Sequence, residues 1–186
     1  DNRAWLVSAS VLAGNAGLVM LNSQVDILML GMLGSFADVG AYRVAAQIAT
    51  LSGFAYTALN MLAMQRFAYL RTTGDFKHLQ ETATLIARLG FLGTLPLPFI
   101  FYFFGEPILR VVFGEQFLPA IKPLFWLLGA QSISAFLGMA STLLVVHRHE
   151  AVIIPFTVIS LLLNFVLCIL LIPRFGMVGA AVSALI

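Results

Sequence analysis

Four polar side chains lie along one side of the first apolar stretch of the chain. They are Ser8, Asn15, Asn22 and Asp26, separated by 7, 7 and 4 residues. In an α-helix these positions fall within about 20° of one line. Hydrocarbon cannot satisfy such groups, so a membrane helix must turn this side toward protein or water. The stripe predicts either the wall of a hydrated cavity or a row of interhelical hydrogen bonds.

Asp26 is the most demanding of these residues, because a carboxylate inside a membrane needs a partner or water. Arg43 follows after a short hairpin loop, and the two side chains could form an ion pair or serve transport. Arg43, Gln47, Thr50 and Thr57 fall within about 40° of a common helical face, which predicts a second polar wall. The Arg43 guanidinium could hold a phosphate there through paired donors. The candidate cavity-lining residues are therefore Asn15, Asn22, Asp26, Arg43, Gln47 and Thr50, with no catalytic residue and no metal ligand predicted.

The composition is that of a membrane protein. Of 186 residues, 61% are hydrophobic and 10% are charged, and the mean hydropathy is +1.00. A soluble domain carries roughly a quarter charged residues. The 22 residues from Ala4 to Val25 carry no charge, which is the length that a helix needs to cross roughly 30 Å of hydrocarbon. A net charge of +2 without a basic, aromatic-rich cluster argues against a nucleic-acid partner.

Hydrophobic segments predict an all-α, polytopic membrane helix bundle with about six transmembrane helices. They cover about residues 5–33, 40–65, 85–104, 124–146, 151–172 and 177–186, the last one incomplete. Two short interfacial helices are expected at about residues 76–84, with Asp75 as N-cap, and 107–113. Pro96 and Pro98 should kink the third segment. Six Lys and Arg residues on one side against four on the other place the start of the chain in the cytoplasm.

Small residues recur at every fourth position in two of the segments. The rows are Ala41, Ala45, Ala49 and Gly53, and Ala130, Ser134, Gly138 and Thr142. Rows of this kind let helix backbones approach closely in membranes. They predict tight helix packing, and the same smooth surfaces would also allow helices to rock against each other.

Three stretches of the chain carry a pattern of motifs in a fixed order. In residues 25–48 a helix ends in an aspartate–apolar–glycine run, followed by a Gly-x-Tyr-x-x-Ala turn made here by Gly40, Tyr42 and Ala45. Together with residues 108–117 and 171–181, this stretch resembles the second half of bacterial polysaccharide flippases. Its members are the O-antigen and capsule exporters, related to multidrug and lipid-linked oligosaccharide transporters.

The resemblance implies helices seven to twelve of a twelve-helix protein, so that the chain would be the C-terminal lobe of a two-lobed transporter. It implies a multi-pass protein of the bacterial inner (plasma) membrane. Such a protein flips undecaprenyl-diphosphate-linked oligosaccharide by alternating access, for O-antigen and lipopolysaccharide synthesis. The implied partners are this substrate, membrane lipids and the N-terminal lobe of the same protein. A coupling ion, H⁺ or Na⁺, is a hypothesis, and no cofactor is expected.

Other functions stay open at this point. A multidrug cation antiporter of the same superfamily would have an acidic cavity with few arginines. A non-transporting membrane scaffold would have a packed interior without a water-accessible stripe. A membrane-embedded glycosyltransferase would need a loop with clustered metal-binding acids, which the sequence lacks, so the chain is not expected to be an enzyme.

Overall fold

The computed structural model describes residues 2–146 and 150–185, with side chains described for residues 10, 13–75, 77–138 and 155–185. The elements are α1 (Asn2–Leu33), α2 (Phe36–Thr72), α3 (Phe76–Thr94), α4 (Pro96–Val112), the short 3-10 helix η1 (Glu115–Ala120), α5 (Ile121–Val146), α6 (Glu150–Phe175) and α7 (Met177–Ser183). The described residues contain no strand, and the predicted all-α class is confirmed.

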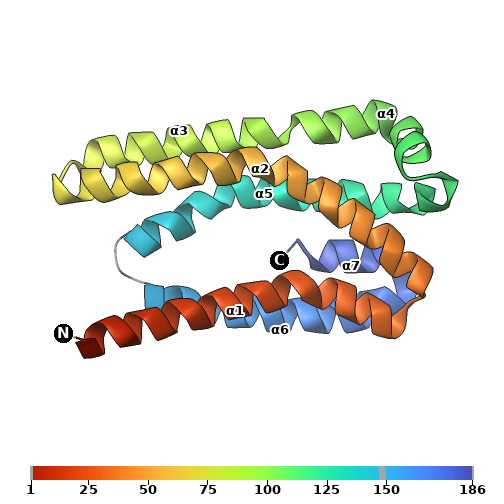
Figure 1. Cartoon of the computed structure of the whole chain (residues 1–186), viewed down its shortest axis with the longest axis horizontal. Helices are drawn as coiled ribbons and strands as arrows, with labels where there is room; N and C mark the ends of the chain where they lie inside the picture. Colours follow the sequence, from red (N-terminus) through yellow and green to blue (C-terminus); the bar gives the residue numbers. More distant parts are fainter. Residues whose placement is uncertain (1, 147–149, 186) are drawn as a thin grey trace.

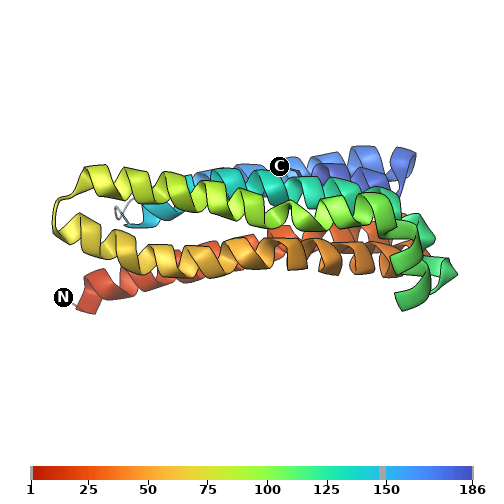
Figure 2. The same ribbon diagram turned by 90° about the horizontal axis from the view of Figure 1, so that it is seen from above.

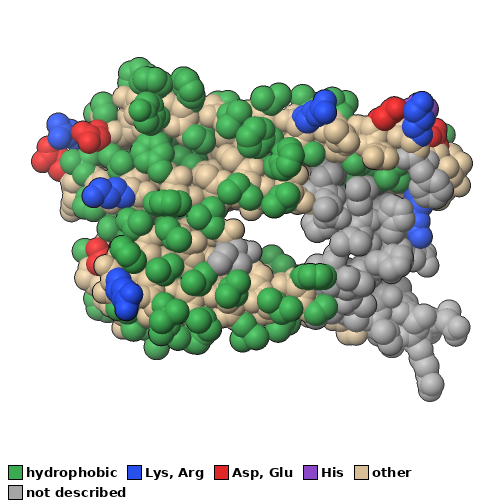
Figure 3. Space-filling model, turned by 180° about the vertical axis from the view of Figure 1, so that it is seen from behind, with side chains coloured by type: hydrophobic (Ala, Val, Ile, Leu, Met, Phe, Trp, Pro, Cys, Tyr) green, Lys and Arg blue, Asp and Glu red, His purple; other side chains and the backbone are tan. Residues whose placement is uncertain are grey.

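The helices form two layers (Figure 1). In one layer α2, α3 and α5 pack together, and in the other α1 lies along α6. The short helix α7 lies between the layers near one end, where it contacts α5 and α6. Seen from above, the long helices follow one common axis (Figure 2). The space-filling view shows a hollow between the two layers (Figure 3).

The surface of the bundle is that of a membrane protein. Four stretches of the described residues are long and apolar enough to cross a membrane, namely Ala13–Leu33, Lys77–Val112, Glu115–Gly138 and Pro155–Phe175. Large apolar side chains cover the outside, and charged side chains gather toward the two ends of the bundle (Figure 3). Soluble proteins rarely expose so much apolar surface to water. The chain is therefore a multi-pass membrane protein.

The prediction of two separate short helices is wrong. Residues 76–84 are the first part of α3, which continues to Thr94 because no proline or glycine interrupts its first turns. Residues 107–112 are the last part of α4, which contains Pro107; membrane helices tolerate an internal proline when neighbouring groups satisfy the freed carbonyl. The break lies instead at Leu95, ahead of Pro96. The segment predicted at 85–104 is thus divided between α3 and α4.

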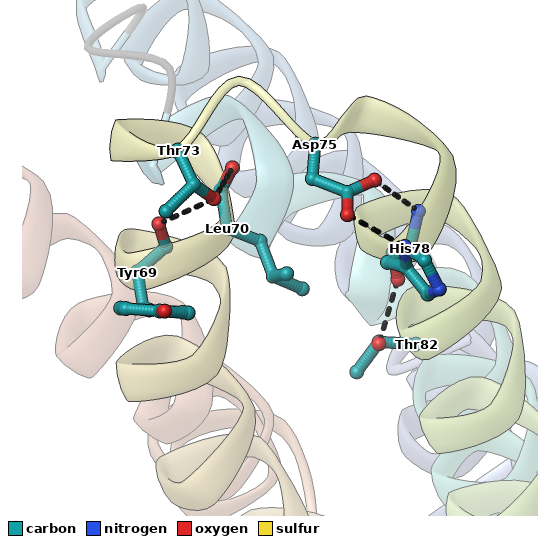
Figure 4. A network of polar contacts seen from close by, with 6 residues as sticks. All are labelled: Tyr69, Leu70, Thr73, Asp75, His78 and Thr82. Atoms are coloured by element: carbon teal, nitrogen blue, oxygen red, sulfur yellow. Dashed lines mark hydrogen bonds and ion pairs between the residues drawn. The ribbon is translucent and has the colours of Figure 1, made fainter.

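Side chains cap both helices at the turn between α2 and α3 (Figure 4). The Thr73 hydroxyl donates to the carbonyl of Leu70 at 3.1 Å, at the end of α2. Gly74 adopts a φ of 72°, a left-handed conformation that favours glycine. Asp75 accepts from the backbone N–H of His78 at 3.2 Å, and its other oxygen lies 2.6 Å from His78 Nδ1. The expected N-cap role of Asp75 is confirmed.

Small residues bring α2 close to its neighbours. The first predicted row is buried against the rest of the bundle at Ala41, Ala45 and Ala49. Farther along α2, Tyr56 occupies the space that a Cβ would need at Gly90 of α3 and at Gly138 of α5. The predicted close packing is confirmed for these positions, while the side chain of Thr142 lies outside the described residues.

Gly179 provides a test of the contact between α7 and α6. A Cβ at Gly179 would lie 2.6 Å from the Leu171 carbonyl carbon and 3.0 Å from the Ile172 nitrogen, whereas a Cβ at Gly129 would meet open space. We expect Gly179→Ala to lower the free energy of unfolding by about 1–3 kcal/mol, because backbone atoms cannot move aside. Gly129→Ala should be neutral or stabilising by about 0.5–1 kcal/mol. Thermal unfolding in one detergent compares them, and equal Tm values would contradict the close approach.

The capped turn predicts a local dependence on pH. The pKa of Asp75 lies below its ordinary value of 3.8, first because the His78 backbone N–H donates to the carboxylate and next because the His78 side chain does. The ionised cap therefore stabilises the start of α3 above about pH 4, and this contribution is lost as the pH falls through the lowered pKa. The backbone amides of residues 77–80 should exchange hydrogen faster below about pH 4, after correction for the intrinsic exchange rates. Asp75→Asn, which caps without titrating, should show no such change.

Candidate functional site

Three polar pairs join α1 to α6 at one constant distance along the sequence. The pairs are Asn15–Thr157, Asn22–Asn164 and Asp26–Cys168, with donor–acceptor distances of 3.2, 3.2 and 3.6 Å and a separation of 142 residues in each case. In all three the α1 residue accepts through a side-chain oxygen. The constant separation means that α1 and α6 run parallel in a fixed register. We call this row of contacts the α1–α6 seam.

The seam supports the interhelical interpretation of the asparagines on α1. Asn15 and Asn22 are half-buried and bond to side chains of α6. They are interhelical hydrogen-bonding residues, which is the arrangement that polar groups between membrane helices usually adopt. The side chain of Ser8 lies outside the described residues.

Asp26 is buried where four helices meet. Its side chain is 7% exposed, and it accepts from the Tyr42 hydroxyl on α2 at 3.4 Å and from the Cys168 thiol on α6. The Cys168 sulfur also lies 3.3 Å from Asn164 Oδ1 and 3.0 Å from the Ser183 hydroxyl on α7. We call these five residues the Asp26 cluster. It connects α1, α2, α6 and α7 through polar side chains.

Asp26 and Arg43 do not form the ion pair that the sequence left open as one alternative. Arg43 is exposed, whereas Tyr42, the residue before it, is buried and reaches the carboxylate. Successive residues of an α-helix point about 100° apart, so a helix that turns Tyr42 inward turns Arg43 away. Among the described residues the ion pairs are Asp75–His78 and Arg110–Glu115.

A cavity of about 210 Å³ opens between the layers beside Asp26. Its polar lining includes Asp26, Thr50, Gln131 and Ser134. Two of the predicted residues, Asp26 and Thr50, therefore share one cavity. Arg43 and Gln47 are exposed on the same helix as Thr50, while the two asparagines belong to the α1–α6 seam.

Several residues of the site were not found from the sequence. Tyr42, Cys168, Ser183 and Gln131 were not predicted as site residues. One available signal was the spacing itself. Thr157, Asn164 and Cys168 repeat on the fifth hydrophobic segment the intervals of 7 and 4 residues found on the first. Matching intervals on two membrane helices indicate polar side chains that can face each other in register.

Comparison with known proteins assigns a family. Residues 6–122 match the model of a family described as polysaccharide biosynthesis protein. The chain belongs to this family. The match includes Asp26, Tyr42 and Thr50, whereas the parts of the Asp26 cluster on α6 and α7 lie beyond it. No solved structure matches the chain.

A similar curated protein is described as a probable low-salt glycan biosynthesis flippase, Agl15, from Haloferax volcanii. It is 26% identical over 164 residues, which cover 87% of this chain and 34% of the relative. The chain thus spans about a third of the length of that relative. The family assignment and this relative confirm the resemblance to polysaccharide flippases. They also agree with the expectation that the chain is not an enzyme.

The register of the seam can be tested with a double-mutant cycle. We expect Asn22→Leu and Asn164→Leu each to lower the free energy of unfolding, because each leaves one amide without its partner. The double variant should be less unstable than the sum, with a coupling energy of about 0.6 kcal/mol, the average for such bonds between membrane helices. Asn22→Leu combined with Thr84→Val, in the other layer, should be additive. Unfolding in detergent compares six proteins, namely the wild type, the three single variants and the two double variants, and zero coupling in the first pair would contradict the seam.

Proposed function

We propose that this chain forms one lobe of a two-lobed transporter that flips a lipid-linked oligosaccharide across a membrane for cell-surface polysaccharide synthesis. The observation that supports this most directly is a polar cavity between two apolar helix layers, in a chain of the polysaccharide biosynthesis protein family. The relative described as a glycan biosynthesis flippase supports the same function. An N-terminal lobe of the same protein would supply the facing wall.

The physical task explains why such a cavity is needed. Sugar hydroxyls and a diphosphate cannot cross hydrocarbon without partners, because each unsatisfied polar group or charge there is costly. A polar passage between two lobes provides these partners while the lipid tail stays in the bilayer. Rigid-body rocking of the lobes about the bound headgroup would expose the passage first to one side and then to the other.

The exposed face of α2 is the part of this lobe that we assign to the passage. It carries Arg43, Gln47 and Thr50, and Thr50 also lines the cavity beside Asp26. The α2 helix is not among the stretches apolar enough to cross the membrane by composition, which fits a helix with one side in water. Arg43 would bind the diphosphate, since a guanidinium donates paired hydrogen bonds to phosphate oxygens.

The substrate and the membrane follow from the same proposal. The carrier lipid would be undecaprenyl diphosphate, the membrane the bacterial inner membrane, and the product an O-antigen or related polysaccharide. The start of the chain would face the cytoplasm, as the excess of Lys and Arg on that side indicates. The turns after α1, α4 and α6 would then face the outside.

The Asp26 cluster would couple transport to H⁺ or Na⁺. A buried carboxylate with hydroxyl and amide oxygens nearby can take up a proton or a small hard cation. Because Asp26 contacts both layers, neutralising its charge would change how α2 and α7 pack against α1 and α6. Ion binding would thereby shift the balance between the two orientations of the lobe.

Arg43 tests the proposed passage. In proteoliposomes holding the full-length protein and a fluorescent lipid-linked oligosaccharide, Arg43→Ala should slow flipping about tenfold or more, as expected for losing a charge-assisted bond to phosphate. Arg43→Lys should recover only part of the rate, because lysine cannot form the paired contact. Arg88→Ala, on the exposed face of α3, is the charge control and should leave the rate unchanged. Equal rates in all four proteins would contradict the proposal.

Asp26 tests the coupling. Flipping by the wild-type protein should respond to an imposed pH or Na⁺ gradient, and Asp26→Asn should remove that response because the amide neither titrates nor attracts a cation. The folded fraction of the variant, measured by gel filtration in detergent, separates loss of coupling from loss of structure. Flat wild-type transport across all gradients would show that the Asp26 cluster is structural.

A further inference from the structure

A second cavity lies at the end of the bundle that holds the turns after α1, α4 and α6. Its volume is about 460 Å³, within the range of about 300–1,000 Å³ that is usual for small-molecule sites. The polar lining consists of Asp38, Glu106 and Lys122, and an aromatic ring is contributed by Phe175. Each of these four residues comes from a different helix, α2, α4, α5 and α6. We call this space the end cavity.

Asp38 is held in place by the start of its own helix. The Ser35 hydroxyl and the Ser35 backbone N–H both donate to Asp38 Oδ2, at 2.8 and 3.3 Å, and Ser35 Oγ in turn accepts from the Asp38 backbone N–H. This capping box fixes the orientation of the carboxylate. Both side-chain bonds use Oδ2, so Oδ1 stays outside the capping box at a half-buried position on the cavity wall.

The remaining groups of the end cavity suit a ligand with many hydroxyls. Glu106 and Lys122 are both exposed and both line the end cavity, so an acceptor and a donor are available to hydroxyl groups. The Phe175 ring is 60% exposed and offers a flat apolar face. A sugar presents the matching chemistry, with hydroxyls around its edge and a face of C–H groups.

The charge of the lining adds selectivity. Two carboxylates, Asp38 and Glu106, stand against the single ammonium of Lys122. An anionic ligand would meet an excess of negative charge, whereas an ammonium on the ligand would be attracted. The end cavity should therefore accept neutral and amino sugars and disfavour uronic acids.

We propose that the end cavity is a binding subsite for a sugar unit of the transported glycan, selective for a neutral or amino sugar over a uronic acid. This inference rests on the proposed function, because the end cavity faces outside, where the glycan emerges, when the start of the chain is cytoplasmic. It places a second sugar-binding position on the lobe, separate from the passage beside Asp26.

Binding of three methyl glycosides to the full-length protein in detergent tests the proposal. The probes are methyl glucoside, methyl glucosaminide and methyl glucuronide, and their Kd values are measured at pH 7 by saturation-transfer NMR. We expect the amino sugar to bind at least about fivefold more tightly than the uronide. Glu106→Gln should weaken amino-sugar binding about tenfold, the loss expected for a charge-assisted hydrogen bond. Glu115→Gln is the matched control, since Glu115 pairs with Arg110 at 3.4 Å at the same end but does not line the cavity.

The outcomes separate this proposal from the proposed function. Equal Kd values for the three probes, tighter binding of the uronide, or an unchanged Kd in Glu106→Gln would overturn the subsite even if the protein flips lipid-linked glycan. Selective binding that depends on Glu106 in a protein without flipping activity would support the subsite and contradict the transport role.

Discussion

One buried carboxylate sets the arrangement of the molecule. Asp26 is an acidic side chain at a buried position where an unpartnered ion would be very costly, so helices that pack around it must supply polar groups. Tyr42 does so from the layer of α2, and Cys168 does so from α6. Ser183 on α7 reaches the same group through Cys168. The need to satisfy Asp26 thus joins the two layers at one point and fixes the place of α7 between them.

The same constraint leaves the rest of the interlayer space open. The α1–α6 seam uses its polar groups within one layer, and the small residues of α2 use the opposite side of that helix for packing. The exposed face of α2 carries Arg43, Gln47 and Thr50, and the Thr50 hydroxyl donates to the Ala46 carbonyl of the same helix at 2.8 Å. A membrane helix with such a face needs water or a polar ligand beside it. We therefore propose that this face of α2 is in contact with water, next to the cluster that would sense an ion.

The sequence predicted the type of structure better than its contacts. Apolar length and the polar stripe were enough for an all-α membrane bundle and for the importance of Asp26, because both depend on local pattern. The partner of Asp26 depended on which of two adjacent residues, Tyr42 or Arg43, turned inward, and the sequence pattern left Arg43 open as the partner. Local proline rules misplaced the helix ends near Leu95 and Pro107, because a proline can begin a membrane helix, as Pro96 does, or lie inside one, as Pro107 does. The matching intervals on α1 and α6 are visible in the sequence. Only the structure shows that these polar residues face each other in that register.

The central claim is that the polar face of α2 is wet while the α1–α6 seam is closed. Single cysteines at Gln47 and at Asn22, in full-length protein with Cys168→Ala, test this directly by their reaction rates with a membrane-impermeant thiol reagent. Gln47→Cys should react rapidly and be protected by added lipid-linked oligosaccharide, while Asn22→Cys should react slowly in either case. A rapid reaction at Asn22→Cys together with an inert Gln47→Cys would reverse the assignment of wet and closed faces and contradict the account.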